Sequence, residues 1–142
     1  MSCVLCETDG GLLVARTPRF RVVRVLDEPG HPAFYRLIWN DHVAEFSDLS
    51  AADRQACMEG VAVIERVLRE QLAPTKVNLA SLGNVVPHLH WHVIARFDGD
   101  SHFPSPIWAG ARRDAVLQLA RPLADVDATI VQLLSATTLT PE

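Results

Sequence analysis

The chain has 142 residues, of which 49% are hydrophobic and 21% charged, so it fits one globular domain that can bury a core. Its formal net charge of −4 argues against binding to a nucleic-acid backbone, which normally requires a basic surface. Residues 1–15 lack a basic region followed by an apolar core, and no stretch approaches the ~18 apolar residues of a membrane span, so we expect a cytoplasmic protein without membrane contact.

Two cysteines near the N-terminus, Cys3 and Cys6, form a Cys-x-x-Cys motif. The three cysteines of the chain are too few and too unevenly spaced for a disulfide framework. In a reducing compartment the motif indicates metal binding or a redox pair, but a tetrahedral zinc site needs two more ligands from elsewhere in the chain. Two incidental thiols are the alternative.

Three β-rich runs come next. Strands are predicted at 12–15, 20–26 and 34–39, because β-branched and aromatic residues gather there. The turn residues Gly10-Gly11 and the cluster from Asp27 to Gly30 bound the first two.

A long amphipathic helix is predicted from Ala51 to about Leu72, where hydrophobic residues recur at helical spacing. Ser50 is its expected N-cap, and Asp53 stands three residues on, in the position of a capping-box acid. Pro74 ends the helix.

Three histidines follow a predicted hairpin turn. Lys76 to Ser81 is a predicted strand and Leu82 to Pro87 a turn containing Gly83, after which His88, His90 and His92 alternate with apolar residues. On a strand, alternate residues share a face and lie roughly 6–7 Å apart, so we expect a half-buried strand whose titratable face carries all three imidazoles. The hairpin can place Asn78 beside that face as a hydrogen-bond partner, although an exposed Asn78 fits the spacing equally well.

The C-terminal third is less regular. Residues 97–109 are rich in proline yet too apolar for a free linker, so we expect them to pack against the domain. Two short helices are predicted at 112–120 and 125–134, split by Pro122, with a frayed tail at 137–142.

The histidine pattern permits two kinds of chemistry. Several imidazoles can act on one phosphate, or two can hold a catalytic zinc ion. The zinc hydrolase is the weaker hypothesis, since no Glu or Asp stands near the histidines with the spacing of His-Glu-x-x-His.

The histidine segment resembles the signature of the histidine triad (HIT) family, His-φ-His-φ-His-φ-φ with φ apolar, at all seven positions from His88 to Ile94. The Cys-x-x-Cys motif, the stretch from Ile38 to His42, Asn78 and an Arg just past the triad extend the resemblance to about residues 3–108. It implies an α+β fold: an antiparallel sheet of about five strands with a long helix, paired as a homodimer through the two sheets. We therefore expect a HIT domain at 1–110 and extra C-terminal helices at 111–142, packed on the same domain.

The resemblance also implies an enzyme, a nucleotidyl hydrolase or transferase that cleaves nucleoside phosphoramidates or dinucleoside polyphosphates at the α-phosphate without an organic cofactor. His90 would be the nucleophile, because a neutral imidazole can form a covalent nucleotidyl intermediate. His92 would donate to the leaving group, His88 would orient its neighbours or serve a metal, and Asn78 would fix a tautomer or contact the phosphate. For the nucleotide, the resemblance implies Asp27 at the ribose, and backbone N–H groups of Gly83, Asn84 and Val85 are candidates to hold phosphate oxygens.

Structural zinc is a further implication, since some members bind it through two N-terminal cysteines and two histidines. The matching residues form a tetrahedral Cys₂His₂ set of Cys3, Cys6, His42 and His88.

Two positions depart from the family pattern. Val85 stands where many members have a hydroxyl residue, and Phe34 where many have a histidine. These departures motivate an alternative function, a nucleotide-binding module of HIT fold with little or no turnover.

Overall fold

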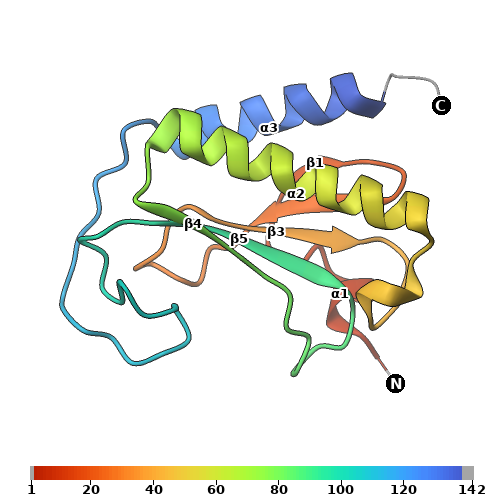
Figure 1. Ribbon diagram of the computed structural model, residues 1–142, viewed down its shortest axis with the longest axis horizontal. Coiled ribbons are helices and arrows are strands. Elements are labelled where there is room, and N and C mark those ends of the chain that lie inside the picture. The colour runs from red at the N-terminus through yellow and green to blue at the C-terminus, as the bar shows by residue number, and fades with distance from the viewer. Residues whose placement is uncertain (1, 139–142) are drawn as a thin grey trace.

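The computed structural model describes residues 2–138, which form an α+β fold built on one antiparallel sheet (Figure 1). The sheet has five strands in the order β1-β2-β3-β5-β4. Its strands are β1 Leu12–Arg16, β2 Phe20–Arg24, β3 Phe34–Trp39, β4 Lys76–Ala80 and β5 His90–Arg96. Its helices are α1 Val4–Glu7, the 3₁₀ helix η1 Phe46–Asp48, α2 Ala51–Leu72 and α3 Leu123–Thr138. The predicted fold class is thereby confirmed.

Two helices cover one face of the sheet. In Figure 1, α2 and α3 run side by side in opposite directions across it. The N-terminus of α2 is fixed by Ser50, whose side chain accepts a hydrogen bond from the Asp53 N–H at 3.1 Å. Its C-terminus is fixed by Ala73, which adopts a left-handed conformation just before Pro74. The helix therefore begins and ends where the sequence predicted. None of the described helices is long and apolar enough to cross a membrane.

The main core lies between these helices and the sheet. Alternate residues of β3, Tyr35, Leu37 and Trp39, point toward α2 and are almost fully buried. Gly60 allows the close approach, because a Cβ atom there would lie 2.6 Å from Cδ1 of Leu37.

Helix α3 joins the same core through Val126, Ile130 and Leu134, which are spaced by one helical turn and buried. Asp127 adds a polar anchor: its carboxylate accepts a hydrogen bond from the Tyr35 hydroxyl at 2.6 Å and pairs with Arg24 at 3.2 Å.

The helix predicted at 112–120 is not formed, and that prediction was wrong. The segment is irregular and largely exposed, with Val116 95% exposed. Leu119 packs partly against the main core, but so little apolar contact in a short segment does not offset the cost of helix nucleation. The predicted tail falls partly within α3, which continues to Thr138, and residues 139–142 lie outside the described part of the chain.

The opposite face of the sheet carries the histidines, and it is covered rather than half-open. The N-terminal segment packs over Val23 and Ile38, while Ile107 of the segment 97–109 packs over Val25, Phe34 and Ile94. Strand β5 begins at His90, so the strand predicted from His88 is shorter by two residues.

Candidate functional site

Strand pairing sets the positions of two triad histidines. His92 lies opposite Arg36 and His90 opposite Ile38 in the antiparallel register of β3 and β5. Residues paired in this way project from the same face, so the two histidines share it with Arg36. The imidazole centroids of His90 and His92 are 5.0 Å apart and nearly perpendicular.

His90 is held in one tautomer. Its Nδ1 atom lies 2.6 Å from the backbone carbonyl oxygen of His88, and a carbonyl can only accept. Nδ1 therefore carries the proton, which leaves the Nε2 lone pair available. Burial lowers the pKa of His90, and Arg36 and His88 lower it further, against the raising effect of the hydrogen bond to His88. The arrangement gives a neutral imidazole with a free nucleophilic nitrogen.

His92 lies in an aromatic enclosure. Its ring contacts Phe34 at 5.5 Å and Trp108 at 5.2 Å between centroids, and its side chain is 5% exposed. Burial, followed by the effects of His90 and Arg36, lowers the pKa of His92 to about 3. At pH 7 the imidazole is neutral, so it offers one N–H donor and one acceptor nitrogen.

Arg36 is a site residue that the sequence analysis missed. Its Nη1 donates to the Gly10 carbonyl oxygen at 3.2 Å, its guanidinium lies 5.4 Å from the Phe34 ring centroid, and its buried Nε has no hydrogen-bond partner among the described residues. Burial lowers the pKa of Arg36, while the carboxylates of Asp27 and Glu28 oppose that shift. Alternation within 34–39 could have put Arg36 on the face of Phe34 and Ile38, but only the pairing of β3 with β5 puts it beside His92.

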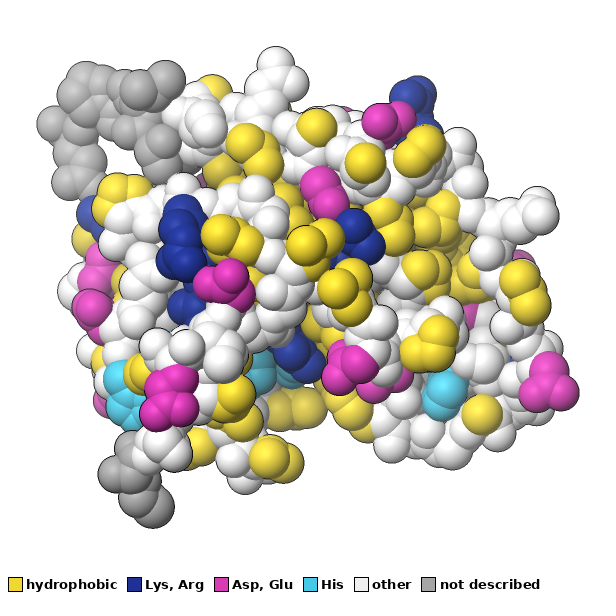
Figure 2. All heavy atoms as spheres, turned by 180° about the vertical axis from the view of Figure 1, so that it is seen from behind, with side chains coloured by type: hydrophobic (Ala, Val, Ile, Leu, Met, Phe, Trp, Pro, Cys, Tyr) yellow, Lys and Arg dark blue, Asp and Glu magenta, His cyan; other side chains and the backbone are white. Residues whose placement is uncertain are grey.

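Seen from behind in Figure 2, histidine side chains reach the surface in the lower half of the molecule, and one group lies in a recess beside basic side chains. Hydrophobic and acidic side chains surround that recess. This part of the surface therefore places histidine and basic side chains next to both acidic and hydrophobic ones.

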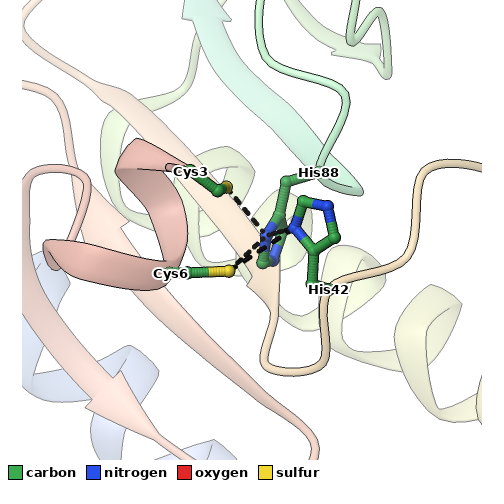
Figure 3. A group of neighbouring side chains, drawn as sticks. All are labelled: Cys3, Cys6, His42 and His88. Atoms are coloured by element: carbon green, nitrogen blue, oxygen red, sulfur yellow. Dashed lines mark hydrogen bonds between the residues drawn. The ribbon is translucent and has the colours of Figure 1, made fainter. Parts of the chain in front are cut away.

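A second cluster contains Cys3, Cys6, His42 and His88 (Figure 3). The single turn of α1 brings the two cysteines together, since the Cys6 N–H donates to the Cys3 carbonyl oxygen at 3.0 Å. The four candidate ligand atoms all lie within 4.8 Å of one another.

The tautomer of His88 suits a metal. Its Nε2 lies 2.6 Å from the backbone carbonyl oxygen of Trp39 and must donate to it, so Nδ1 is unprotonated. That Nδ1 is the atom that faces the sulfur atoms of Cys3 and Cys6, at 3.4 and 3.5 Å. Burial lowers the pKa of His88, which keeps the ring neutral. Two thiols, two imidazoles and an oriented hydrogen bond behind one ligand fit a tetrahedral Zn²⁺ site.

This geometry argues against a zinc hydrolase that uses all three triad histidines. His88 directs Nδ1 into the cysteine cluster, whereas His90 directs Nδ1 at the His88 backbone. Within residues 2–138, no metal-binding group contains His90 or His92.

The other predicted site residues lie further from the imidazoles. Asn78 projects from β4 opposite Ile94, and its side-chain oxygen accepts from Arg96 at 2.9 Å rather than from a histidine. Asp27 is exposed at the end of β2, within electrostatic reach of Arg36. Gly83, with φ +72°, and Asn84 lie in the β4–β5 loop beside Val85, which is 93% exposed. Among the described residues, no hydrogen bond joins Gly83, Asn84 or Val85 to a triad histidine.

His31, another buried histidine, belongs to a separate network. Its Nε2 lies 3.2 Å from Nδ1 of His102, close to Asp100. The position of the missing imidazole is filled by Phe34, whose ring packs on His92.

Comparisons with known proteins agree with this architecture. A family model described as HIT domain matches residues 12–99. A solved histidine triad protein from Bradyrhizobium japonicum is 29% identical, with a TM-score of 0.68 over 86% of this chain and 87% of that one. One from Marinobacter aquaeolei VT8 is 25% identical, with a TM-score of 0.70 over 90% of this chain and 91% of that one.

A zinc-bound histidine triad family protein from Mycobacterium smegmatis is 22% identical, with a TM-score of 0.65 over 96% of this chain and 98% of that one. At 22% identity, this similarity shows a shared fold only. A comparison with curated proteins gives no match.

Proposed function

The chain belongs to the histidine triad (HIT) family, and we propose that it is a nucleotidyl hydrolase or transferase that cleaves at the α-phosphate through a covalent intermediate on His90. The observation that carries this proposal is the hydrogen bond from Nδ1 of His90 to the His88 carbonyl, which leaves Nε2 unprotonated. The substrates are dinucleoside polyphosphates or nucleoside phosphoramidates.

In the first step, Nε2 of His90 attacks the α-phosphorus. A bond forms between Nε2 and phosphorus, and the bond from phosphorus to the leaving group breaks with its electron pair going to the leaving atom. The positive charge on the ring is offset by the Nδ1 hydrogen bond to the His88 carbonyl. His92 donates its N–H to the leaving atom, and Arg36 attracts the anionic substrate to this face.

In the second step, water enters from the side that the leaving group has vacated. A bond from the water oxygen to phosphorus forms, the bond from phosphorus to Nε2 breaks, and the electron pair returns to His90. The water proton passes to solvent, and a nucleoside monophosphate leaves. A different acceptor in place of water makes the same chemistry a transfer.

Structural zinc would be held by Cys3, Cys6, His42 and His88. When bound there, it would supply folding energy at the N-terminus, and His88 would be held as one of its ligands. Because the His88 carbonyl positions His90, a rigid His88 stabilises the nucleophile's orientation.

The remaining parts of the proposal rest on the family resemblance. Asp27 binds the ribose, and backbone N–H groups of Gly83, Asn84 and Val85 hold phosphate oxygens. Asn78 steadies Arg96 at the end of the histidine strand. The protein is a cytoplasmic homodimer whose sheets join, and residues 111–142 form an extension of the HIT domain.

Intact-protein mass spectrometry tests the function. The protein is mixed rapidly with adenosine 5′-phosphoramidate or diadenosine tetraphosphate and quenched without acid, since a phosphoramidate is acid-labile. We expect an adenylyl adduct that maps to His90 and is lost in His90→Ala. An adduct on another residue, or turnover by His90→Ala, contradicts the assignment.

One observation favours the alternative of a binding module with little turnover. Phe34 packs on His92, so the position that could carry another imidazole contributes none. If nucleotide binds while neither adduct nor product accumulates, this alternative replaces the enzyme.

A further inference from the structure

Trp108 is an exposed aromatic residue in direct contact with the site. Its ring centroid lies 5.2 Å from that of His92, yet half of its surface, 50%, is open to solvent. Residues whose only role is to fill a core bury most of such a ring.

The neighbouring residue explains why Trp108 stands in this place. Ile107 is buried in the cluster of Val25, Phe34 and Ile94 on the histidine face. Because Ile107 enters that cluster, the next side chain emerges at its edge, where His92 lies.

The segment that carries Trp108 is rigidly fixed. Arg96, 1% exposed, pairs with the buried carboxylate of Asp100 at 2.8 and 3.0 Å and donates to the Ser105 carbonyl oxygen at 2.8 Å. The Asp100 carboxylate also accepts from three backbone N–H groups, those of Phe97, His102 and Phe103. A buried ion pair with its hydrogen bonds satisfied specifies one conformation. This network anchors the segment that leads to Trp108 to the end of β5.

The contact with His92 places Trp108 on the leaving-group side of the proposed active site. Trp108 touches His92, the imidazole assigned to the leaving group, and its ring contact is with His92 rather than with His90. An exposed indole face offers stacking to a planar aromatic group, and stacking on a base depends little on which base it is.

We propose that Trp108 forms a subsite for the base of the departing nucleotide, so that the enzyme favours dinucleoside polyphosphates over phosphoramidates with a small amine. This inference rests on the proposed function and adds the substrate class. The state of His92 agrees with it: a phosphate oxygen can leave as an anion, whereas an amine must gain a proton, which a neutral imidazole supplies poorly.

The test compares two substrates that transfer the same adenylyl group, diadenosine tetraphosphate and adenosine 5′-phosphoramidate. Trp108→Ala should lower kcat/KM for the first by about tenfold to a hundredfold relative to the second, mainly through KM. Trp108→Phe keeps an aromatic face and should restore most of the ratio. Equal losses on both substrates, or none on either, would overturn the inference, because a residue that only shields His92 affects both alike.

The proposed function fails if the wild-type protein turns over neither substrate. A binding measurement tests the Trp108 subsite independently of that outcome. In the His90→Ala background, Trp108→Ala should weaken diadenosine tetraphosphate binding about tenfold while leaving AMP binding nearly unchanged. Parallel changes for the two ligands would sink the leaving-base subsite whether or not catalysis is observed.

Discussion

His88 and His90 are joined by a 2.6 Å hydrogen bond from the imidazole of the second to the backbone carbonyl of the first. The side chain of His88 points into the Cys₂His₂ cluster, while its backbone carbonyl holds His90, the proposed nucleophile. Stability at the N-terminus and the orientation of His90 are therefore linked.

Zinc removal should lower stability before it affects chemistry. The four proposed ligands lie at the start of and within α1, in the segment after β3 and just before Leu89. A metal bound to them would tie distant parts of the chain together. We expect a strong chelator to lower the Tm of the wild-type protein by several degrees. Cys6→Ser should have a lowered Tm without chelator, and the chelator should not lower it further.

Cys57→Ala is the matched control, since Cys57 is a buried thiol in α2 outside the cluster. It should keep the full response to the chelator. A wild-type Tm that ignores the chelator, or purified protein without zinc and with an unchanged Tm, contradicts a structural metal.

The buried His92 should make stability fall in acid. Its ordinary pKa of 6.5 applies in the unfolded chain and about 3 in the fold, so the unfolded chain binds more protons between these values. The contribution of His92 to stability is fully present above pH 6.5 and is lost progressively as pH falls toward 3. Urea unfolding of wild type and His92→Gln at pH 7 and pH 5 measures this, and the variant should lose less between the two. Equal losses would mean that other groups control the acid transition.

Arg36→Leu should change both the site's charge and its ligand affinity. Removing a cation that lowers the pKa of His92 should raise that pKa, which NMR titration of the imidazole measures. AMP binding should weaken about tenfold, as for the loss of a charged hydrogen bond to phosphate. Arg36→Lys keeps the charge and should retain the His92 pKa. Wild-type affinity in Arg36→Leu would show that the guanidinium does not meet the phosphate.

Asp127 should stabilise the packing of α3. Asp127→Ala removes the partner of the Tyr35 hydroxyl and of Arg24, and leaving a buried hydroxyl unpaired costs about 1–3 kcal/mol. Chemical denaturation measures the free energy of unfolding, with Asp114→Ala as an exposed control. Tyr35→Phe in the Asp127→Ala background should cost less than in the wild type, and full additivity would show that the hydrogen bond is energetically silent.

Local sequence patterns were sufficient to predict those elements whose formation depends on residues close together in the chain. Ser50 and Pro74 bracket α2, and the gathering of aromatic and β-branched residues locates β3 from Phe34 to Trp39, because caps and residue propensities are local properties. The Cys₂His₂ set came from the family resemblance, since no spacing rule relates Cys3 to His88.

Other features depend on which segments of the chain cover a surface, and sequence periodicity carries no information about that. The histidine face looked half-open because polar residues alternate there, yet the segment 97–109 buries it. Arg36 and Asp127 matter through partners on other elements, His92 and Tyr35, so neither has a local signal. The sequence of residues 112–120 likewise does not reveal that Val116 lies exposed and that Leu119 is only partly buried against the main core, so the helix predicted there was wrong.

The irregular stretch between Ala109 and α3 is a site where a protease could cleave the chain. It is largely exposed and includes the exposed Arg113, after which trypsin could cut without entering the core. Helix α3 would stay in place after such a cut, because Val126, Ile130 and Leu134 are buried in the main core and Asp127 is bound to the sheet. A protein cleaved once at this stretch would therefore migrate as two fragments on a denaturing gel and as one particle in solution.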